Sequence, residues 1–183
     1  VYKRQVISYF VENAPNTLSK AKFSAEMERS LGLGAMGFHA YLQRHNIPFE
    51  SPMAKGTNLK MFKHIKSEAL NATKTLAMER GEAPDAVGHG VRNVHLLAVA
   101  PNASSSIICG NTSPSIEPYR ANAFTQKTKS GSSLLKNEYL EYALQELDQD
   151  TDEVWKSIIT NNGSVQHLDF LDEWTKDVFK TAV

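Results

Sequence analysis

The residues best suited to chemistry form a loop of small polar side chains at Pro101–Ser105, within the stretch VAPNASSSII. The loop follows an apolar run and lacks the glycine or aspartate that turns usually recruit. Where such a loop leads into a short helix, successive backbone amides converge and bind anions, and serine hydroxyls add donors. The same residues also suit a capped turn between a strand and a helix. The residues alone leave both interpretations open.

The charge balance of the chain means that any anion must be held by local geometry. Lys plus Arg and Asp plus Glu each number 20, so the formal net charge is zero. No overall field draws the chain to nucleic acid or to an anionic membrane. Hydrogen bonds to a charged group contribute about 1.5 to 3 kcal/mol each, so the loop would position a phosphate without selecting a substrate.

Other features that resemble cofactor or metal motifs do not support such a site. GLGAMG at Gly32–Gly37 has dinucleotide-loop spacing, but a helical pattern precedes it where a strand is required. We expect these glycines to let a helix approach a neighbouring element closely. The six histidines lack metal-ligand spacing, so no metal site is predicted. The single cysteine, Cys109, follows two isoleucines and is predicted to be a buried residue in a reducing compartment.

The elements around the loop are mostly helical. Apolar residues at helical spacing predict helices over Glu26–His45, Asn58–Arg80, Asn137–Leu147, after Thr151, and around Phe170–Phe179. NVHLLAVA at Asn93–Ala100 predicts a strand covered on both faces, with His95 facing a core or a neighbouring strand. A run of this length also suits a buried helical segment. A second strand is expected around Ala121–Thr125, followed by a turn at KSGSS, residues 129–133. No repeat or linker is visible, so residues 1–183 are predicted to form a single domain.

Several ordered motifs resemble the large (α) subunit of aerobic class I ribonucleotide reductases, which reduce ribonucleoside diphosphates to deoxyribonucleotides. They are GHGVRNVHLLAVAPNASSSIICGNTSPSIEPY at Gly88–Tyr119, RSLGLGAMGFHAYL, ALNATKTLAMERGEAP and SVQHLDFLDEWTKDVFKTA. The short link GEAPDAVGHGVRN is similar to that of bacteriophage members. The resemblance implies an α/β fold, a helix-rich part of the family's ten-stranded α/β barrel.

The resemblance also implies which residues bind substrate. In the family, the segment that matches Pro101–Ser105 holds the substrate diphosphate through backbone amides and hydroxyls. The implied substrate-binding residues are Pro101, Asn102, Ala103, Ser104, Ser105 and Arg120. Arg120 stands at a basic position near the family's substrate site, and its alternative role is that of a solvated surface arginine. No catalytic residue is expected, because the family's radical cysteine, tyrosine relay and terminal cysteine pair match nothing in this chain.

The implied function is to supply the diphosphate-binding loop of a ribonucleoside-diphosphate reductase, an oxidoreductase of DNA precursor synthesis. The chain would be inactive alone and would need a partner segment with the radical cysteine. No cofactor is expected in it. The complete enzyme would use a metal-containing radical-generating β subunit and a thioredoxin or glutaredoxin reductant. The expected partners are a ribonucleoside diphosphate, the remaining α-subunit segments and the β subunit, with no nucleic acid and no membrane.

The alternative is a non-catalytic relic, or a helical interaction domain that kept the fold. An excised fragment and the product of a split gene fit the sequence equally well. No apolar run approaches the roughly 18 residues of a membrane span, and the expected location is the cytoplasm.

Overall fold

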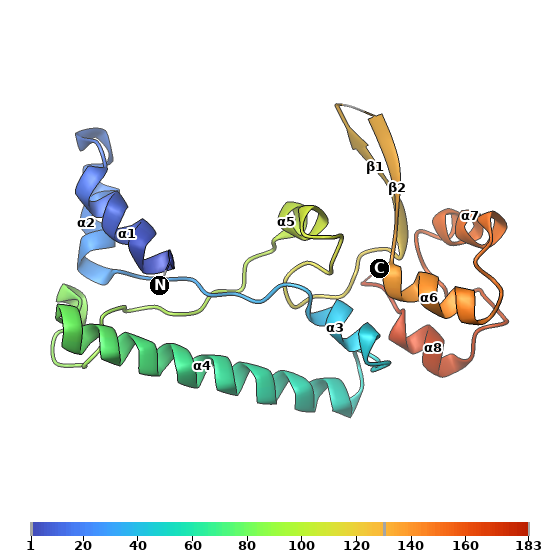
Figure 1. Ribbon diagram of the computed structural model, residues 1–183, viewed down its shortest axis with the longest axis horizontal. Helices are drawn as coiled ribbons and strands as arrows, with labels where there is room; N and C mark the ends of the chain where they lie inside the picture. Colours follow the sequence, from blue (N-terminus) through green and yellow to red (C-terminus); the bar gives the residue numbers. More distant parts are fainter. Residues whose placement is uncertain (1, 130, 183) are drawn as a thin grey trace. The chain divides into compact units, whose positions relative to one another are not determined.

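The computed structural model describes residues 2–129 and 131–182, which fall into two compact units (Figure 1). Unit 1 comprises Val1–Gly34 and Leu59–Val99, and unit 2 comprises Ala35–Asn58 and Ala100–Val183. The single domain expected across residues 1–183 stays a prediction.

Unit 1 is built from helices joined by extended backbone. It contains α1 (Tyr2–Asn13), the 3-10 turn η1 (Asn16–Leu18), α2 (Ser19–Glu28), most of α4 (Pro52–Arg80) and the 3-10 turn η2 (Pro84–Ala86). The prediction that α4 begins at Asn58 is wrong by six residues. Ser51 Oγ accepts a hydrogen bond from the Ala54 amide at 3.2 Å, and Pro52 follows it as the first helical residue. The predicted end at Arg80 is confirmed.

The prediction of one helix over Glu26–His45 is also wrong, because the helical structure is interrupted in the middle of this range. Arg29 takes a left-handed conformation, with φ +48°, and ends α2. The next helix, α3, spans Phe38–Arg44 and belongs to unit 2. GLGAMG lies between the two helices as extended or irregular backbone.

The glycines of this linker do permit a close approach, but between extended segments rather than beside a helix. A Cβ at Gly32 would lie 2.9 Å from Ala98 Cβ, and one at Gly34 would lie 2.6 Å from the Ala98 carbonyl oxygen. The Leu33 amide donates to the Leu96 carbonyl at 2.9 Å. Any side chain at either glycine would push these two backbones apart.

The prediction that Asn93–Ala100 forms a strand covered on both faces is wrong. Among the described residues, its strand pairing is one isolated parallel bridge, Leu33 to Leu97. Leu97 is 38% exposed, Val99 is 73% exposed, and His95 is exposed rather than facing a core. The segment is extended as predicted, but the exposure of Leu97 and Val99 shows that its two faces are not both covered within the described residues.

Unit 2 holds one antiparallel hairpin and several short helices. Its elements are α3, α5 (Ala103–Ile108), β1 (Ala123–Thr128), β2 (Gly131–Lys136), α6 (Glu138–Glu146), α7 (Asp152–Thr160) and α8 (Glu173–Val178). β1 confirms the strand expected near Ala121–Thr125, and its Ala123 pairs with Lys136 of β2. Of the predicted KSGSS turn, residues 131–133 belong to β2, and Ser130 lies outside the described residues.

The core of unit 2 forms where the predicted C-terminal helices pack together. Its buried members are Ala123, Leu140, Leu144, Trp155, Ile158, Val165, Leu168, Leu171, Val178 and Phe179. Asn137 accepts from the Tyr139 amide at the start of α6, and Thr151 accepts from the Val154 amide at the start of α7. Both caps confirm the predicted helix starts.

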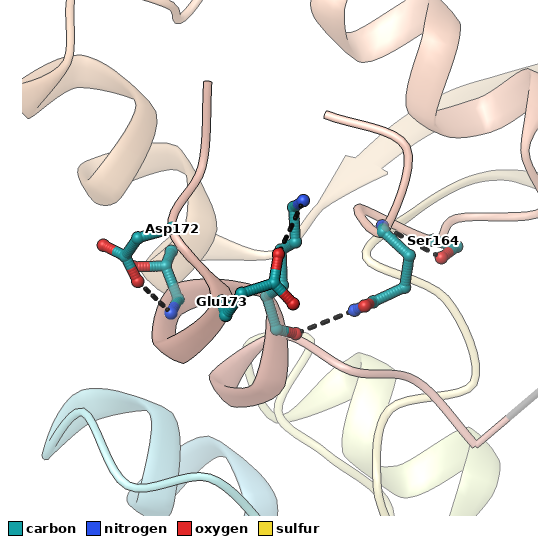
Figure 2. A network of polar contacts seen from close by, with 6 residues as sticks. Ser164, Asp172 and Glu173 are labelled. Atoms are coloured by element: carbon teal, nitrogen blue, oxygen red, sulfur yellow. Dashed lines mark hydrogen bonds and ion pairs between the residues drawn. The ribbon is translucent and has the colours of Figure 1, made fainter. Parts of the chain in front are cut away.

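Helix α8 is shorter than the apolar spacing predicts, and polar contacts define both of its ends (Figure 2). Asp172 Oδ1 accepts from the Thr175 amide at 2.7 Å and caps the start. Near the other end, the Gln166 side chain donates to the Lys176 carbonyl at 2.9 Å. Glu173 pairs with Lys176 at 3.1 Å. In the loop before α8, Ser164 Oγ accepts a hydrogen bond from the Gln166 amide.

Buried amide side chains join the parts of unit 2. Asn137 Nδ2 donates to Gln43 Oε1 at 2.9 Å and to Asn122 Oδ1 at 2.8 Å. Asn122 Nδ2 donates to the Phe179 carbonyl at 2.8 Å and to the Gly163 carbonyl at 3.1 Å. We call Gln43, Asn122 and Asn137 the amide network. It connects α3, the start of β1, the start of α6 and the end of α8.

Acid is expected to destabilise unit 2 through His39, which is fully buried and accepts a hydrogen bond at Nδ1 from the Tyr119 amide. Burial lowers the pKa of His39 to about 4, partly opposed by the Val178 carbonyl. The unfolded chain therefore binds a proton that the folded chain excludes, and stability falls as the pH drops from about 6.5 towards 4. The expected loss is about 3 kcal/mol, measured by urea unfolding across this pH range. His39→Gln should flatten the pH profile, whereas His45→Gln, at an exposed histidine, should preserve it; an unchanged slope in His39→Gln would contradict the assignment.

Two buried serines should respond oppositely to loss of their hydroxyl groups. Ser115 Oγ is the buried side-chain polar atom without a hydrogen-bond partner among the described residues, whereas Ser113 Oγ accepts from the Ala40 amide at 3.0 Å. Ser115→Ala is expected to raise the free energy of unfolding by about 1 kcal/mol, and Ser113→Ala to lower it by about 1 to 2 kcal/mol. Thermal unfolding of the two variants measures both effects, and destabilisation by Ser115→Ala would refute the account.

Candidate functional site

A short helix follows Pro101 as predicted, but it begins earlier than expected. Only Pro101 and Asn102 of the predicted loop lie outside it, because Ala103–Ser105 form the first turn of α5. Asn102 takes a left-handed conformation with φ +51° and precedes α5, with no side-chain cap. The Ser106 amide donates to the Asn102 carbonyl at 2.9 Å, which closes the first turn. The amides of residues 103–105 therefore lie ahead of the first bond within the helix and form its donor end.

The three consecutive serines have different surroundings. Ser104 and Ser105 are exposed, whereas Ser106 is buried and donates its hydroxyl to the Ala103 carbonyl at 2.8 Å. Pro101 is exposed and Asn102 is half-buried. Ser106 is thus used inside the helix, and the two preceding serines present their side chains at the surface.

A pocket of about 760 Å³ opens beside α5 within unit 2. It is lined by Ala103, Ser106, Ile107, Asn111, Thr112, Pro114, Tyr119, Arg120, Ala121, Ala123, Phe124, Thr125, Ile159 and Asn162. Of the predicted site residues, Ala103 and Arg120 line the pocket, and Pro101, Asn102, Ser104 and Ser105 do not. Its size lies in the range of small-molecule sites, about 300 to 1,000 Å³.

Hydrogen bonds hold one wall of this pocket in place. The Tyr119 hydroxyl donates to the Asn111 carbonyl at 3.1 Å, and Asn111 Nδ2 donates to the Lys136 carbonyl at 3.1 Å. Burial raises the pKa of Tyr119 well above its ordinary value, so its hydroxyl stays protonated. Arg120 is exposed and brings a cation to the pocket. A mostly apolar wall with a few oriented polar groups suits an organic ligand that carries an anionic group.

The sequence analysis missed the polar pocket residues that follow the loop. Asn111, Thr112, Tyr119 and Asn162 line the pocket but were not among the predicted site residues. The available signal was the position of Asn111 and Tyr119 inside GNTSPSIEPY, the same motif that carried the resemblance. Asn162 comes from a distant segment, so only the fold places it there.

Neither the single cysteine nor the residue types that bind metals form a second candidate site in the described part of the chain. Cys109 is exposed and follows the last turn of α5, so the prediction of a buried filler is wrong. Within residues 2–129 and 131–182, no group of three or more His, Cys, Asp or Glu side chains is placed to hold a metal ion. In the same part of the chain, no helix has both the length and the apolar character needed to cross a bilayer.

Comparison with known sequences places the chain beside one family. A family model described as "Ribonucleotide reductase, barrel domain" matches residues 5–87 and 85–183. The ribonucleoside-diphosphate reductase large subunit of Invertebrate iridescent virus 3 is 49% identical over 98% of this chain and 29% of its own length. That of Invertebrate iridescent virus 6 is 49% identical over 96% of this chain and 19% of its own length. These relatives are viral, which matches the bacteriophage expectation only loosely.

A solved structure gives the same result. The Actinobacillus ureae class Id ribonucleotide reductase alpha subunit superposes with a TM-score of 0.86 at 42% identity, over 97% of this chain and 33% of that one. The chain therefore spans no more than about a third of these relatives. The family resemblance and the helix-rich partial α/β barrel fold are both confirmed.

One backbone contact of the pocket can be tested with a matched pair of glycines. Gly163 and Gly81 have φ values of +82° and +81°, but a Cβ at Gly163 would lie 2.3 Å from Ala121 Cβ, whereas one at Gly81 meets nothing within 4 Å. Gly81→Ala should lower the free energy of unfolding by about 1 kcal/mol, because alanine is strained in the left-handed conformation. Gly163→Ala should lower it by about 3 kcal/mol or more, because the new Cβ also clashes with Ala121. Urea unfolding measures both, and equal losses would show that the approach of Ala121 to Gly163 is not close.

Proposed function

Because the chain belongs to the ribonucleotide reductase barrel-domain family, we propose that it supplies the substrate-diphosphate site of a ribonucleoside-diphosphate reductase α subunit. The observation that carries this proposal is the donor end of α5 beside the pocket. The amides of residues 103–105 and the exposed hydroxyls of Ser104 and Ser105 are available to an anion. Ala103 belongs to both the loop and the pocket wall.

The proposed binding mode divides the substrate between two surfaces. The diphosphate lies against the start of α5, where amides and serine hydroxyls donate to its oxygens. The nucleoside lies in the pocket, against apolar side chains such as Ile107 and Phe124. Arg120, exposed at the pocket, adds a positive charge beside the proposed diphosphate position. The site binds a part of the substrate that does not react, so its role is positioning.

The remaining components of the reaction are proposals of the same kind. The radical cysteine belongs to another segment of the α subunit, and this chain alone is inactive. No cofactor is assigned to it; the complete enzyme would use a metal-containing radical-generating β subunit and a thioredoxin or glutaredoxin reductant. The proposed setting is the cytoplasm, with neither nucleic acid nor membrane as a partner.

A binding experiment on the full chain tests the proposal. A ribonucleoside diphosphate is titrated while backbone amide NMR signals are followed, and the signals of residues 103–105 are expected to shift in a saturable manner. The variant Ser104→Ala with Ser105→Ala should weaken binding about a hundredfold or more, because two hydrogen bonds to a charged group are lost. Arg120→Gln should weaken it further, since one positive charge leaves the pocket.

The matched control removes two serines elsewhere in the same unit. Ser132→Ala with Ser133→Ala, at exposed positions of β2, should leave the affinity unchanged. The unphosphorylated ribonucleoside should fail to shift residues 104 and 105, which do not line the pocket. Unchanged diphosphate affinity in the Ser104 and Ser105 variant would contradict the proposal and favour the non-catalytic interaction domain.

A further inference from the structure

Unit 1 contains a second concentration of anion-binding groups, separate from the serine loop. Arg4, Arg29, Arg80 and Arg92 line a hollow of about 30 Å³ together with Ile7, Ser8 and Asn93. They come from α1, the end of α2, the end of α4 and the loop after η2. We call these four residues the arginine cluster.

The positive charge of this cluster is not balanced within the described part of the chain. None of the ion pairs found among residues 2–129 and 131–182 involves these four arginines. Two of the carboxylates close to them in sequence, Glu28 and Glu82, accept hydrogen bonds from other donors. Glu28 accepts from the Ser30 hydroxyl at 3.0 Å, and Glu82 accepts from the Gly88 and Gly90 amides.

The backbone holds the cluster together despite the repulsion between like charges. The Thr73 hydroxyl on α4 accepts from the Arg92 amide at 3.1 Å and donates to Asn93 Oδ1 at 3.0 Å. Asn93 Nδ2 donates to the Arg29 carbonyl at 2.7 Å. Arg92 Nη1 also donates to the Gly81 carbonyl at 3.1 Å. Burial, followed by the charges of Arg29 and Arg80, lowers the pKa of Arg92.

An anion would stabilise this arrangement. Arg4, Arg29 and Arg92 are half-buried, whereas Arg80 is exposed. Like charges held close together repel one another, and guanidinium groups supply several N–H donors to an oxyanion. One water needs about 10 to 15 Å³ of such space, so the hollow admits a small group and excludes a nucleoside. A planar carboxylate pairs with one or two guanidinium groups, whereas a tetrahedral dianion accepts from several directions.

We propose that the arginine cluster binds a tetrahedral oxyanion of the phosphate class, carried either by free phosphate or by the phosphoryl group of a nucleotide. The Ser8 side chain completes the lining of the hollow. This site does not depend on the proposed substrate loop, because all of its residues belong to unit 1 and those of the loop belong to unit 2.

The test titrates inorganic phosphate into the full chain at constant ionic strength and follows the arginine Nε–H signals by NMR. The signals of Arg4, Arg29, Arg80 and Arg92 are expected to shift together and to saturate. Arg80→Gln, at an exposed helix end, is expected to weaken binding about tenfold. Arg4→Gln should do the same from a different helix. Lys74→Gln, an exposed cation on α4, is the matched control and should change the affinity less than twofold.

Two further titrations distinguish the sources of the phosphoryl group. A nucleoside diphosphate that shifts the same four signals with higher affinity than phosphate identifies a nucleotide ligand, and the reverse order identifies free phosphate. Ser104→Ala with Ser105→Ala should leave these arginine shifts intact, which separates this site from the substrate loop. Shifts that grow linearly and are reproduced by chloride would overturn the proposal, as would unchanged affinity in both arginine variants.

Discussion

The amide network of Gln43, Asn122 and Asn137 is the constraint on which unit 2 depends. Each of these side chains is buried, and each connects elements that are distant in sequence. A buried amide that loses its partner costs about 1 to 3 kcal/mol, so the network holds only one arrangement of α3, β1, α6 and α8. Asn137 has a second task, because its Oδ1 accepts from the Tyr139 amide and caps α6.

This constraint reaches the candidate site through Asn122. The Asn122 amide and side chain both donate to the Gly163 carbonyl, at 3.0 and 3.1 Å. Asn162 and Ala121, which flank these two positions, line the pocket. The close approach at Gly163 leaves no room for a Cβ. The positions of Ala121 and Asn162 in the pocket wall are therefore set by packing and hydrogen bonding in the core.

The two candidate anion sites obtain their positive potential in different ways, although the chain as a whole is neutral. The serine loop uses partial charges of consecutive backbone amides, so its residues are neighbours in sequence. The arginine cluster uses full charges from four separate segments. The first kind of site can be identified from a motif. The second kind cannot, because no local pattern distinguishes Arg4 or Arg80 from an ordinary surface arginine.

The sequence by itself determined the family, the helical character, the helix starts at Asn137 and after Thr151, and the presence of a short helix after Pro101, because these depend on ordered motifs and local hydrogen bonds. It misplaced the features that depend on distant partners. The helix predicted over Glu26–His45 breaks because Arg29 is left-handed and the glycine linker pairs with residues 95–98. The run at 93–100 is partly open to solvent because, within the described residues, no packed layer covers both of its faces. Only the tertiary structure decided which residues line the pocket and where the arginines converge, since both depend on segments that meet in space but lie far apart along the chain.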